Sequence, residues 1–577
     1  MILQALYKYY ERMPDLPRPG FELKPIPFVI EISETGELVQ IEDTRILEDK
    51  KKIARNFLVP QGQKKTSGVA ANFLWDSVEY VLGISDASKL DERRATNKEN
   101  EYLARVKEMH TAFIAEITSR LAQAEILQAV LRFLENEQQV KLQTHPLWPE
   151  IDAGNPILSF RLSGDKELIC QRQEIRALFE STSTATKEIT CLITGKRDNF
   201  ERLHTAIKGV WGAQTSGANI VSFNKDAFNS FAKEQGANAP VGKQAAFSYT
   251  TALNHLLRKG STQRMQVGDA STVFWSEKPS VLEDSFASIF DEPPKDDPAR
   301  QTRAIEALFK SPQTGSFVDE GGDTPFYVLG LAPNAARISV RFWLIGTVAG
   351  MSQQIRQHFE DLKITHASFE KPHLSLFRLL VSTAALGKSE NIPPNLAGDV
   401  MRAILEGLPY PQTLLAAAVR RIRAERDVTY PRAALIKACL NRQGRYSHSQ
   451  EKELNVSLDE TNLNPGYRTG RLFAVLEKIQ EESSPGLNAT IRDRFYGAAA
   501  STPVTVFANL MKLKNHHLAK LEEGRKRYFE KLIGDILSSV SDFPAHLNLA
   551  DQGRFAIGYY HQRQAFFIRS ESINKGE

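Results

Sequence analysis

Residues 203–219 combine side chains that bind nucleic acid with the backbone freedom that close approach to a ligand requires. They read LHTAIKGVWGAQTSGAN, with three glycines, two side-chain amides, hydroxyls, a lysine and a tryptophan, and no acidic residue. Glycine lets a backbone come close to a ligand, and the N–H groups of such turns bind anions. We therefore predict a surface that contacts a polyanion such as nucleic acid, and a purely structural Gly-rich loop is the alternative. The candidate contacts are Lys208, Gln214, Ser216 and Asn219, with Asn224 in the strand-like run 220–225 that follows.

A second candidate surface lies in residues 64–76, which read KKTSGVAANFLWD. The ammonium groups of Lys64 and Lys65 and the hydroxyl of Ser67 suit contact with phosphates. The side-chain amide of Asn72 can pair with a base edge. The alternative is a solvated turn, after which the apolar residues begin a core helix.

Two sets of cations follow helical spacing in the C-terminal part. Arg420 and Arg423 share a predicted helix whose other side is apolar, and Lys512, His516 and Lys520 are spaced four residues apart. The functional interpretation is a groove along a phosphate backbone, contacted by these arginines and lysines. An ordinary solvated helix face is the alternative.

The compact signatures of enzymes that act on nucleic acids or nucleotides are missing. The nearest approach to a phosphate loop, VGKQ at 241–244, lacks the leading glycine and the hydroxyl, and neither HExxH nor a His-Asp dipeptide occurs. Three other candidates are interpreted as structural: the adjacent His516 and His517, the pair His366 and His373, and Cys191 with His204. We expect no catalytic residue, no metal site and no cofactor.

The composition is that of an ordinary globular protein, with 577 residues of which 42% are hydrophobic and 25% charged. The net charge of +4 is small, but its distribution is uneven. Residues 187–264 hold eleven Lys and Arg against five Asp and Glu, and residues 402–445 hold nine against three. These two basic islands are compatible with nucleic acid, although ordinary surface clustering also produces such counts.

No apolar run approaches the ~20 residues that a membrane helix needs. The opening MILQALYKYYER has too short an apolar run for a secretory signal and no cleavage site. The cysteines Cys170, Cys191 and Cys439 are odd in number and widely spaced, which argues against a disulfide framework and against a thiolate zinc site. We expect a cytoplasmic protein that does not contact a membrane.

Periodicity and turn signals predict the elements that position these residues. Residues 26–32 and 38–42 form a candidate hairpin around Gly36, and residues 100–137 have helical spacing. Further predicted strands are 56–60, 189–193, 270–275, 326–332 and 338–345, and residues 245–257 are a predicted helix. We expect an α+β fold with mixed, β-rich N-terminal and central regions, followed by an α-helical bundle.

Three domains are predicted on this basis. They are residues 1–165, an α+β region with the basic loop; residues 166–390, a mixed region with the Gly-rich segment and a solvated acidic connector at 277–300; and residues 391–577, a helical domain.

Long runs of the sequence resemble the type I-C large-subunit family of the CRISPR Cascade complex, the Csd family. They are CLITG at Cys191, IKGVWGAQTSGANIVSFN at Ile207, NAPV at Asn238, YTTALNHLL at Tyr249, VFW at Val273, LGLAPNAARISVRFW at Leu329, NATIRDRFYGAA at Asn488, KNHHLAK at Lys514 and DQGRFAIGYYHQRQAFF at Asp551. The opening MILQALYKYYERM and NFLWDSVEYVLG at Asn72 fit as well, so the resemblance spans nearly the whole chain. One departure is Ala70-Ala71, where the resemblance leads us to expect a Lys-Pro pair.

The resemblance implies a non-enzymatic large subunit that recognises a protospacer-adjacent motif in double-stranded target DNA and helps open the duplex for pairing with crRNA. The implied partners are the crRNA, the backbone, handle-binding and small subunits, and a recruited helicase-nuclease that cuts the DNA. The helical C-terminal domain resembles the small subunit.

Two other functions stay open at this point. A metal-independent endoribonuclease that processes crRNA would use His204 and Lys208, which are four residues apart, and would cleave repeat RNA. A purely architectural scaffold subunit would lose assembly, rather than DNA binding, when the Gly-rich segment is changed.

Overall fold

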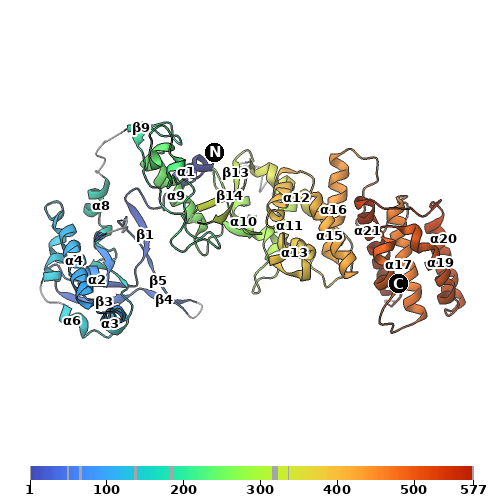
Figure 1. Cartoon of the computed structure of the whole chain (residues 1–577), viewed down its shortest axis with the longest axis horizontal. Helices are drawn as coiled ribbons and strands as arrows, with labels where there is room; N and C mark the ends of the chain where they lie inside the picture. The colour runs from blue at the N-terminus through green and yellow to red at the C-terminus, as the bar shows by residue number, and fades with distance from the viewer. Residues whose placement is uncertain are drawn as a thin grey trace. The chain divides into compact units, whose positions relative to one another are not determined.

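The chain forms two compact units in the computed structural model (Figure 1), which describes residues 2–48, 51–63, 68–135, 139–180, 188–314, 322–335 and 337–574. Unit 1 consists of Met1–Arg12, Arg202–Asn238 and Ala252–Glu577, and unit 2 consists of Met13–Glu201 and Ala239–Thr251. Helices and small sheets together confirm the predicted α+β class. The division into three domains stays a prediction.

Unit 2 is built on a four-stranded sheet. Its strands lie in the order β3 (Leu38–Asp43), β2 (Phe28–Ile32), β8 (Ile157–Leu162) and β7 (Trp75–Ser77). Strands β2 and β3 are antiparallel, which confirms the predicted hairpin. Gly36 in their connection has φ +83°, and a Cβ there would lie 2.6 Å from Cβ of Arg132, so the turn requires glycine.

The predicted helical stretch 100–137 is a pair of helices, α4 (Glu99–Thr118) and α5 (Leu127–Glu135). Phe113 of α4 and Phe133 of α5 are fully buried in the same core as the sheet. The other elements of unit 2 are β1 (Phe21–Pro25), β4 (Arg45–Glu48), β5 (Lys51–Ala54), β6 (Asn56–Pro60), α2 (Val78–Val81), α3 (Ala87–Ala95), α6 (Gln139–Gln143), α7 (Trp148–Asp152), α8 (Gln173–Glu180), β9 (Glu188–Thr190) and β10 (Arg197–Asn199).

Unit 1 contains an antiparallel four-stranded sheet in sequence order. Its strands are β11 (Arg264–Val267), β12 (Ala270–Ser276), β13 (Pro325–Asn334) and β14 (Arg337–Thr347). Every residue of β12 is buried. The predicted strand pair 326–332 and 338–345 is confirmed, but Pro333 and Asn334 belong to β13, and Ala335 follows with φ +52°.

The acidic stretch 277–300 was expected to be a solvated connector, and this prediction is wrong. Residues 281–290 form helix α10 (Val281–Phe290), which buries Leu282, Phe286 and Ile289 in the core of unit 1. These residues recur at three- and four-residue spacing, so they form one apolar helix face, whereas the acidic residues dominate the composition. The prediction relied on the number of acidic residues and overlooked the helical spacing of the apolar ones.

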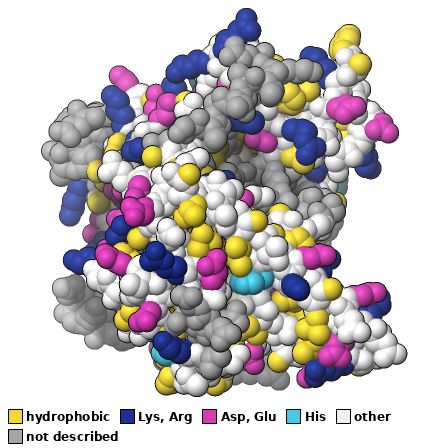
Figure 2. Space-filling view, turned by 90° about the vertical axis from the view of Figure 1, so that its left-hand side faces the viewer, with side chains coloured by type: hydrophobic (Ala, Val, Ile, Leu, Met, Phe, Trp, Pro, Cys, Tyr) yellow, Lys and Arg dark blue, Asp and Glu magenta, His cyan; other side chains and the backbone are white. Residues whose placement is uncertain are grey.

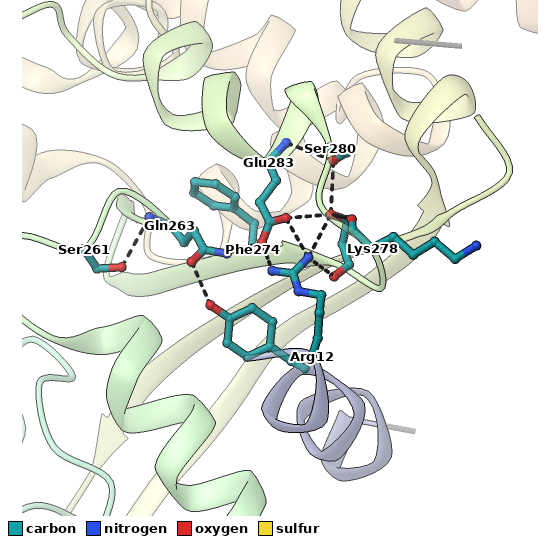
Figure 3. A network of polar contacts seen from close by, with 9 residues as sticks. Arg12, Ser261, Gln263, Phe274, Lys278, Ser280 and Glu283 are labelled. Carbon is teal, nitrogen blue, oxygen red and sulfur yellow. Dashed lines mark hydrogen bonds and ion pairs between the residues drawn. The ribbon is translucent and has the colours of Figure 1, made fainter. Parts of the chain in front are cut away.

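The first helix of the chain, α1 (Ile2–Arg12), is bound into unit 1 by a buried polar network (Figure 3). The guanidinium of Arg12 donates to both carboxylate oxygens of Glu283, at 2.6 and 2.8 Å, and the Glu283 side chain is only 6% exposed. The hydroxyl of Ser276 also donates to this carboxylate, at 2.7 Å. Tyr9 donates to Gln263 at 2.8 Å, and Gln263 in turn donates to Glu283.

The part of unit 1 that follows β14 is mainly helical, which confirms the expected helical C-terminal part (Figure 1, yellow to red). In chain order the other helices of unit 1 are α9 (Lys243–Leu257, whose first residues belong to unit 2), α11 (Arg300–Thr314), α12 (Val348–Leu362), α13 (Leu376–Thr383), α14 (Leu396–Glu406), α15 (Gln412–Glu425), α16 (Tyr430–Tyr446), α17 (Pro465–Ser483), α18 (Ile491–Ala499), α19 (Pro503–Leu518), α20 (Glu523–Leu537) and α21 (Leu549–Asn574). Helices α17 and α21 pack closely: a Cβ at Gly470 would overlap the carbonyl of Phe555, and one at Gly558 would overlap the carbonyl of Tyr467. None of the described helices is both long and apolar enough to cross a bilayer.

We predict that Arg12→Ala lowers the free energy of unfolding of unit 1 by about 3 to 5 kcal/mol, because it leaves a buried carboxylate without its partner. Urea unfolding followed by tryptophan fluorescence measures the change. The matched control on the same helix is Lys8→Ala, which removes an exposed ion pair to Glu277 and should cost less than about 1 kcal/mol. Equal effects of the two substitutions would contradict the prediction.

Candidate nucleic-acid interface

The Gly-rich segment of unit 1 is a closed loop. Ile207 and Ala218 form an antiparallel bridge in which each N–H donates to the carbonyl of the other residue at 2.9 Å. Gly217 beside this bridge has φ +93°, and a Cβ there would lie 2.8 Å from the carbonyl oxygen of Ile207. The loop can therefore close only with glycine at position 217. This requirement explains one of the three glycines of the segment.

Two polar side chains anchor the first half of the loop to regular structure. Asn254 of α9 accepts from the N–H of Lys208 at 2.7 Å and donates to the carbonyl of Ala206 at 3.1 Å. The hydroxyl of Ser271 in β12 accepts from the N–H of Trp211 at 2.9 Å. These bonds use the main chain of the loop, so the side chains of Lys208 and Trp211 stay exposed.

The second half of the loop lies against the start of β14. Asn219 bridges to Arg337, and the N–H of Ile338 donates to the carbonyl of Asn219 at 3.2 Å. The guanidinium of Arg337 donates to the side-chain oxygen of Asn224 at 2.5 Å and lies 4.4 Å from the ring centre of Phe228. The run 220–225, predicted to be strand-like, contains no strand in the structure. The Asn224 side chain of this run is held by Arg337.

Arg337 and Phe228 are members of this site that sequence reasoning missed. Arg337 comes directly after the turn between two predicted strands, where an arginine has no periodic signal to distinguish it. Phe228 is 38% exposed and lies outside the Gly-rich run. Only the fold places them beside Asn224.

Exposed cations are numerous on residues 202–238 and 258–259, which together form the Gly-rich surface. Six basic side chains here are exposed, and within the described residues none of them forms an ion pair: Arg202, Lys208, Lys225, Lys233, Arg258 and Lys259. The exposed acids of the same segments are Asp226 and Glu234. On the face shown in Figure 2, Lys and Arg side chains are interspersed with Asp and Glu side chains. Unpaired cations beside amides and hydroxyls suit a polyanion.

The basic island at 402–445 has a largely structural explanation. Three of its cations are buried and donate to carbonyls near the ends of α13, α12 and α14: Arg432 to Ser382 at 2.8 Å, Lys437 to Asp361 at 2.9 Å and Arg442 to Ala403 at 3.0 Å. The last carbonyls of a helix have no partner within the helix and carry partial negative charge, so cations stabilise them. Arg445 forms ion pairs with Asp361 and Glu453. Part of the positive charge here is thus internal, whereas Arg420, Arg423 and Arg426 are exposed.

The predicted contacts lie in several places. Lys64, Lys65 and Ser67 fall outside the described residues. Gln214 and Ser216 are exposed in the Gly-rich loop with Lys208, Asn224 is exposed beside Arg337, and Asn219 is half-buried there. Arg420 and Arg423 are exposed on α15, and Lys512 is exposed on α19. Lys520 is exposed but follows the end of α19, so the predicted helical face stops at His516.

Asn72 in unit 2 has a structural role in the loop that contains it. The residue is 5% exposed, and its side-chain oxygen accepts from the N–H of Gln63 at 2.9 Å. Its own N–H donates to Asp76 at 3.0 Å. The next residues form strand β7, not the helix that the structural alternative predicts. Contact of Asn72 with a base stays a prediction.

The side chains considered for catalysis have other contacts. The thiol of Cys191 is buried in unit 2, where it accepts from the N–H of Gly242 at 3.2 Å. Burial raises the pKa of this thiol, but the N–H donors around it outweigh burial and leave the pKa below its ordinary value. His204 is buried in unit 1, whereas Lys208, its partner in the endoribonuclease hypothesis, is exposed. No group of three or more potential metal ligands occurs in the described part of the chain.

We predict that Gly217→Ala opens the loop, because the added methyl group meets the Ile207 carbonyl in a backbone conformation that alanine disfavours. Hydrogen exchange of the Ile207 and Ala218 amides should accelerate roughly tenfold or more, which corresponds to about 1.4 kcal/mol. Gly212→Ala is the matched control: Gly212 also has positive φ, +75°, but a Cβ there makes only ordinary contact, 3.4 Å from Pro333. Unchanged exchange in Gly217→Ala would show that the bridge does not depend on this glycine.

Comparison with known protein families gives one match. The family described as CRISPR-associated protein (Cas_Csd1) matches residues 6–567. No curated protein matches the chain. The match covers both units, including the Gly-rich loop and the strand that carries Arg337.

Proposed function

Since the chain belongs to the Csd1 family of CRISPR-associated proteins, we propose that it is the non-enzymatic large subunit of a type I-C Cascade complex. In this role it recognises the protospacer-adjacent motif in duplex DNA, helps open the duplex for pairing with crRNA, and supports recruitment of the helicase-nuclease. Its partners are the crRNA and the backbone, handle-binding and small subunits. It acts in the cytoplasm.

One observation carries the proposal: the exposed cations of the Gly-rich surface form no ion pair with a carboxylate of the described residues. A single exposed lysine without an ion-pair partner has little effect on stability. Several such cations next to glycine turns, where the main chain is accessible, form a site that phosphates can approach closely. Phosphate contacts position a protein on DNA, whereas amides such as those of Gln214 and Asn224 can contact base edges.

We predict that the double substitution Lys208→Ala and Lys225→Ala weakens DNA binding equally for all sequences. Each lost phosphate contact lowers the slope of log affinity against log salt concentration by about 0.9, so the slope should fall by about 2. Gel-shift titrations of the assembled complex between low and physiological salt measure it. Lys531→Ala, an exposed lysine of α20, is the control and should leave the slope unchanged. An unaltered slope in the double variant would remove these lysines from the interface.

Asn72 should affect sequence preference rather than general affinity. Asn72→Ala is expected to reduce discrimination between matched and motif-mutated targets by about 1 to 3 kcal/mol, the contribution of one good base contact. Competition gel shifts with the two targets measure the difference.

The control for this substitution is Asp76→Asn, which perturbs the same loop through the bond to the Asn72 main chain and keeps the Asn72 side chain. Loss of discrimination in Asn72→Ala alone supports base contact. Equal loss in both variants assigns the effect to folding of the loop, and full discrimination in Asn72→Ala removes the residue from recognition.

A further inference from the structure

Two large aromatic side chains of the same surface lie in solvent. Phe231 is 93% exposed and Trp211 is 65% exposed. Phenylalanine is among the residues most often buried in folded proteins. Binding of phosphates does not explain why these two rings are exposed.

The loop that carries Phe231 is held in place mainly by the side chain of Asn238. Asn238 accepts from the N–H of Ser230 at 2.9 Å and donates to the side chain of Asn229 at 3.1 Å and to the carbonyls of Lys233 and Gln235 at 3.1 and 3.0 Å. Arg202 also donates to the side chain of Gln235, at 2.5 Å. Because these bonds close the loop on both sides of Phe231, the exposure of the ring is part of a defined structure.

The backbone at Phe231 is in an unfavourable conformation. Phe231 has φ +51° and Ala232 has φ +53°, both in the left-handed region that residues with a Cβ avoid. Strain of this kind persists only where the surrounding bonds determine it, and it concentrates at binding sites. Here the bonds of Asn238 hold the strained turn, and the turn directs the ring away from the core.

Polar neighbours and a stacked cation favour a nucleic acid over an apolar partner of this loop. Lys225 and Lys233 are exposed on either side of Phe231, with Asp226 and Glu234 as the neighbouring acids. Phe228, three residues before Phe231, already has the planar guanidinium of Arg337 on its ring, at 4.4 Å. Exposed aromatic rings near lysine and arginine side chains are groups with which proteins bind unpaired bases.

We propose that Phe231, together with Trp211, stacks on unpaired nucleobases, so that the ligand of this surface is a single-stranded nucleic acid. The inference rests on the proposed function and specifies its ligand. A base inside a duplex is stacked on both faces and offers no free surface to a ring, whereas an unpaired base does. Stacking needs no particular base, so this contact holds a separated strand without reading its sequence.

The test measures binding of the full-length protein to single-stranded oligonucleotides that contain one 2-aminopurine, whose emission is quenched when an aromatic ring stacks on it. Phe231→Ala and Trp211→Ala should each weaken binding about five- to a hundredfold and remove the quenching. Phe231→Tyr keeps the ring and should retain both. Oligonucleotides of the same sequence are tested with deoxyribose and with ribose. The substitutions should reduce binding more for the type of strand that is the natural ligand, which distinguishes separated DNA strands from RNA.

Phe369→Ala is the matched control, because Phe369 is 86% exposed in the same unit but lies outside the Gly-rich surface. It should bind as the parent protein does. Unchanged binding and quenching in Phe231→Ala, with binding still reduced by the lysine substitutions, would overturn stacking and leave the proposed function standing. A parent protein that binds no nucleic acid would overturn both. Normal binding with failed assembly of the complex would assign Phe231 to a protein contact and overturn the inference.

Discussion

Unit 1 depends on strand β12, because both of the distant segments that complete the unit are fastened to it. Ser271 near the start of the strand binds the main chain of Trp211, and Ser276 at its end binds the carboxylate that holds Arg12. Both serines are fully buried, so each hydroxyl acts where water does not compete for it. A fully buried strand thus places the Gly-rich loop and the first helix in one unit.

The two basic islands have different physical causes, which a count of charges does not reveal. In the first, six lysines and arginines of unit 1 are exposed and form no ion pair among the described residues, so their field acts on solvent and ligands. In the second, three cations are buried and bind carbonyls at the ends of helices, so their charge does not reach solvent. Burial and partners, rather than density along the sequence, decide which cations can meet a polyanion.

Much of the fold could be predicted from local pattern, and much of the site could not. The hairpin around Gly36, helix α9 and the strand pair β13–β14 follow from periodicity and turn residues, which act over a few positions. Arg337 joins Asn224 across more than a hundred residues, and no local pattern indicates such a contact. Asn72 was predicted to contact a base because of its side-chain amide. The same amide bonds the main chain of Gln63 in its own loop, and composition does not distinguish these two roles.

The bond between Arg12 and Glu283 joins residues that are 271 positions apart in the chain. A ribosome adds about 5 to 20 residues per second, so α1 leaves it tens of seconds before its partners β12 and α10 exist. During that interval the apolar face of α1, with Leu6 and Tyr9, has no core to enter, while the residues of unit 2 that follow can already fold around their own sheet. Helix α1 is therefore synthesised first but can pack only after β12 and α10 have been made. Until then its apolar face is not covered by the rest of unit 1.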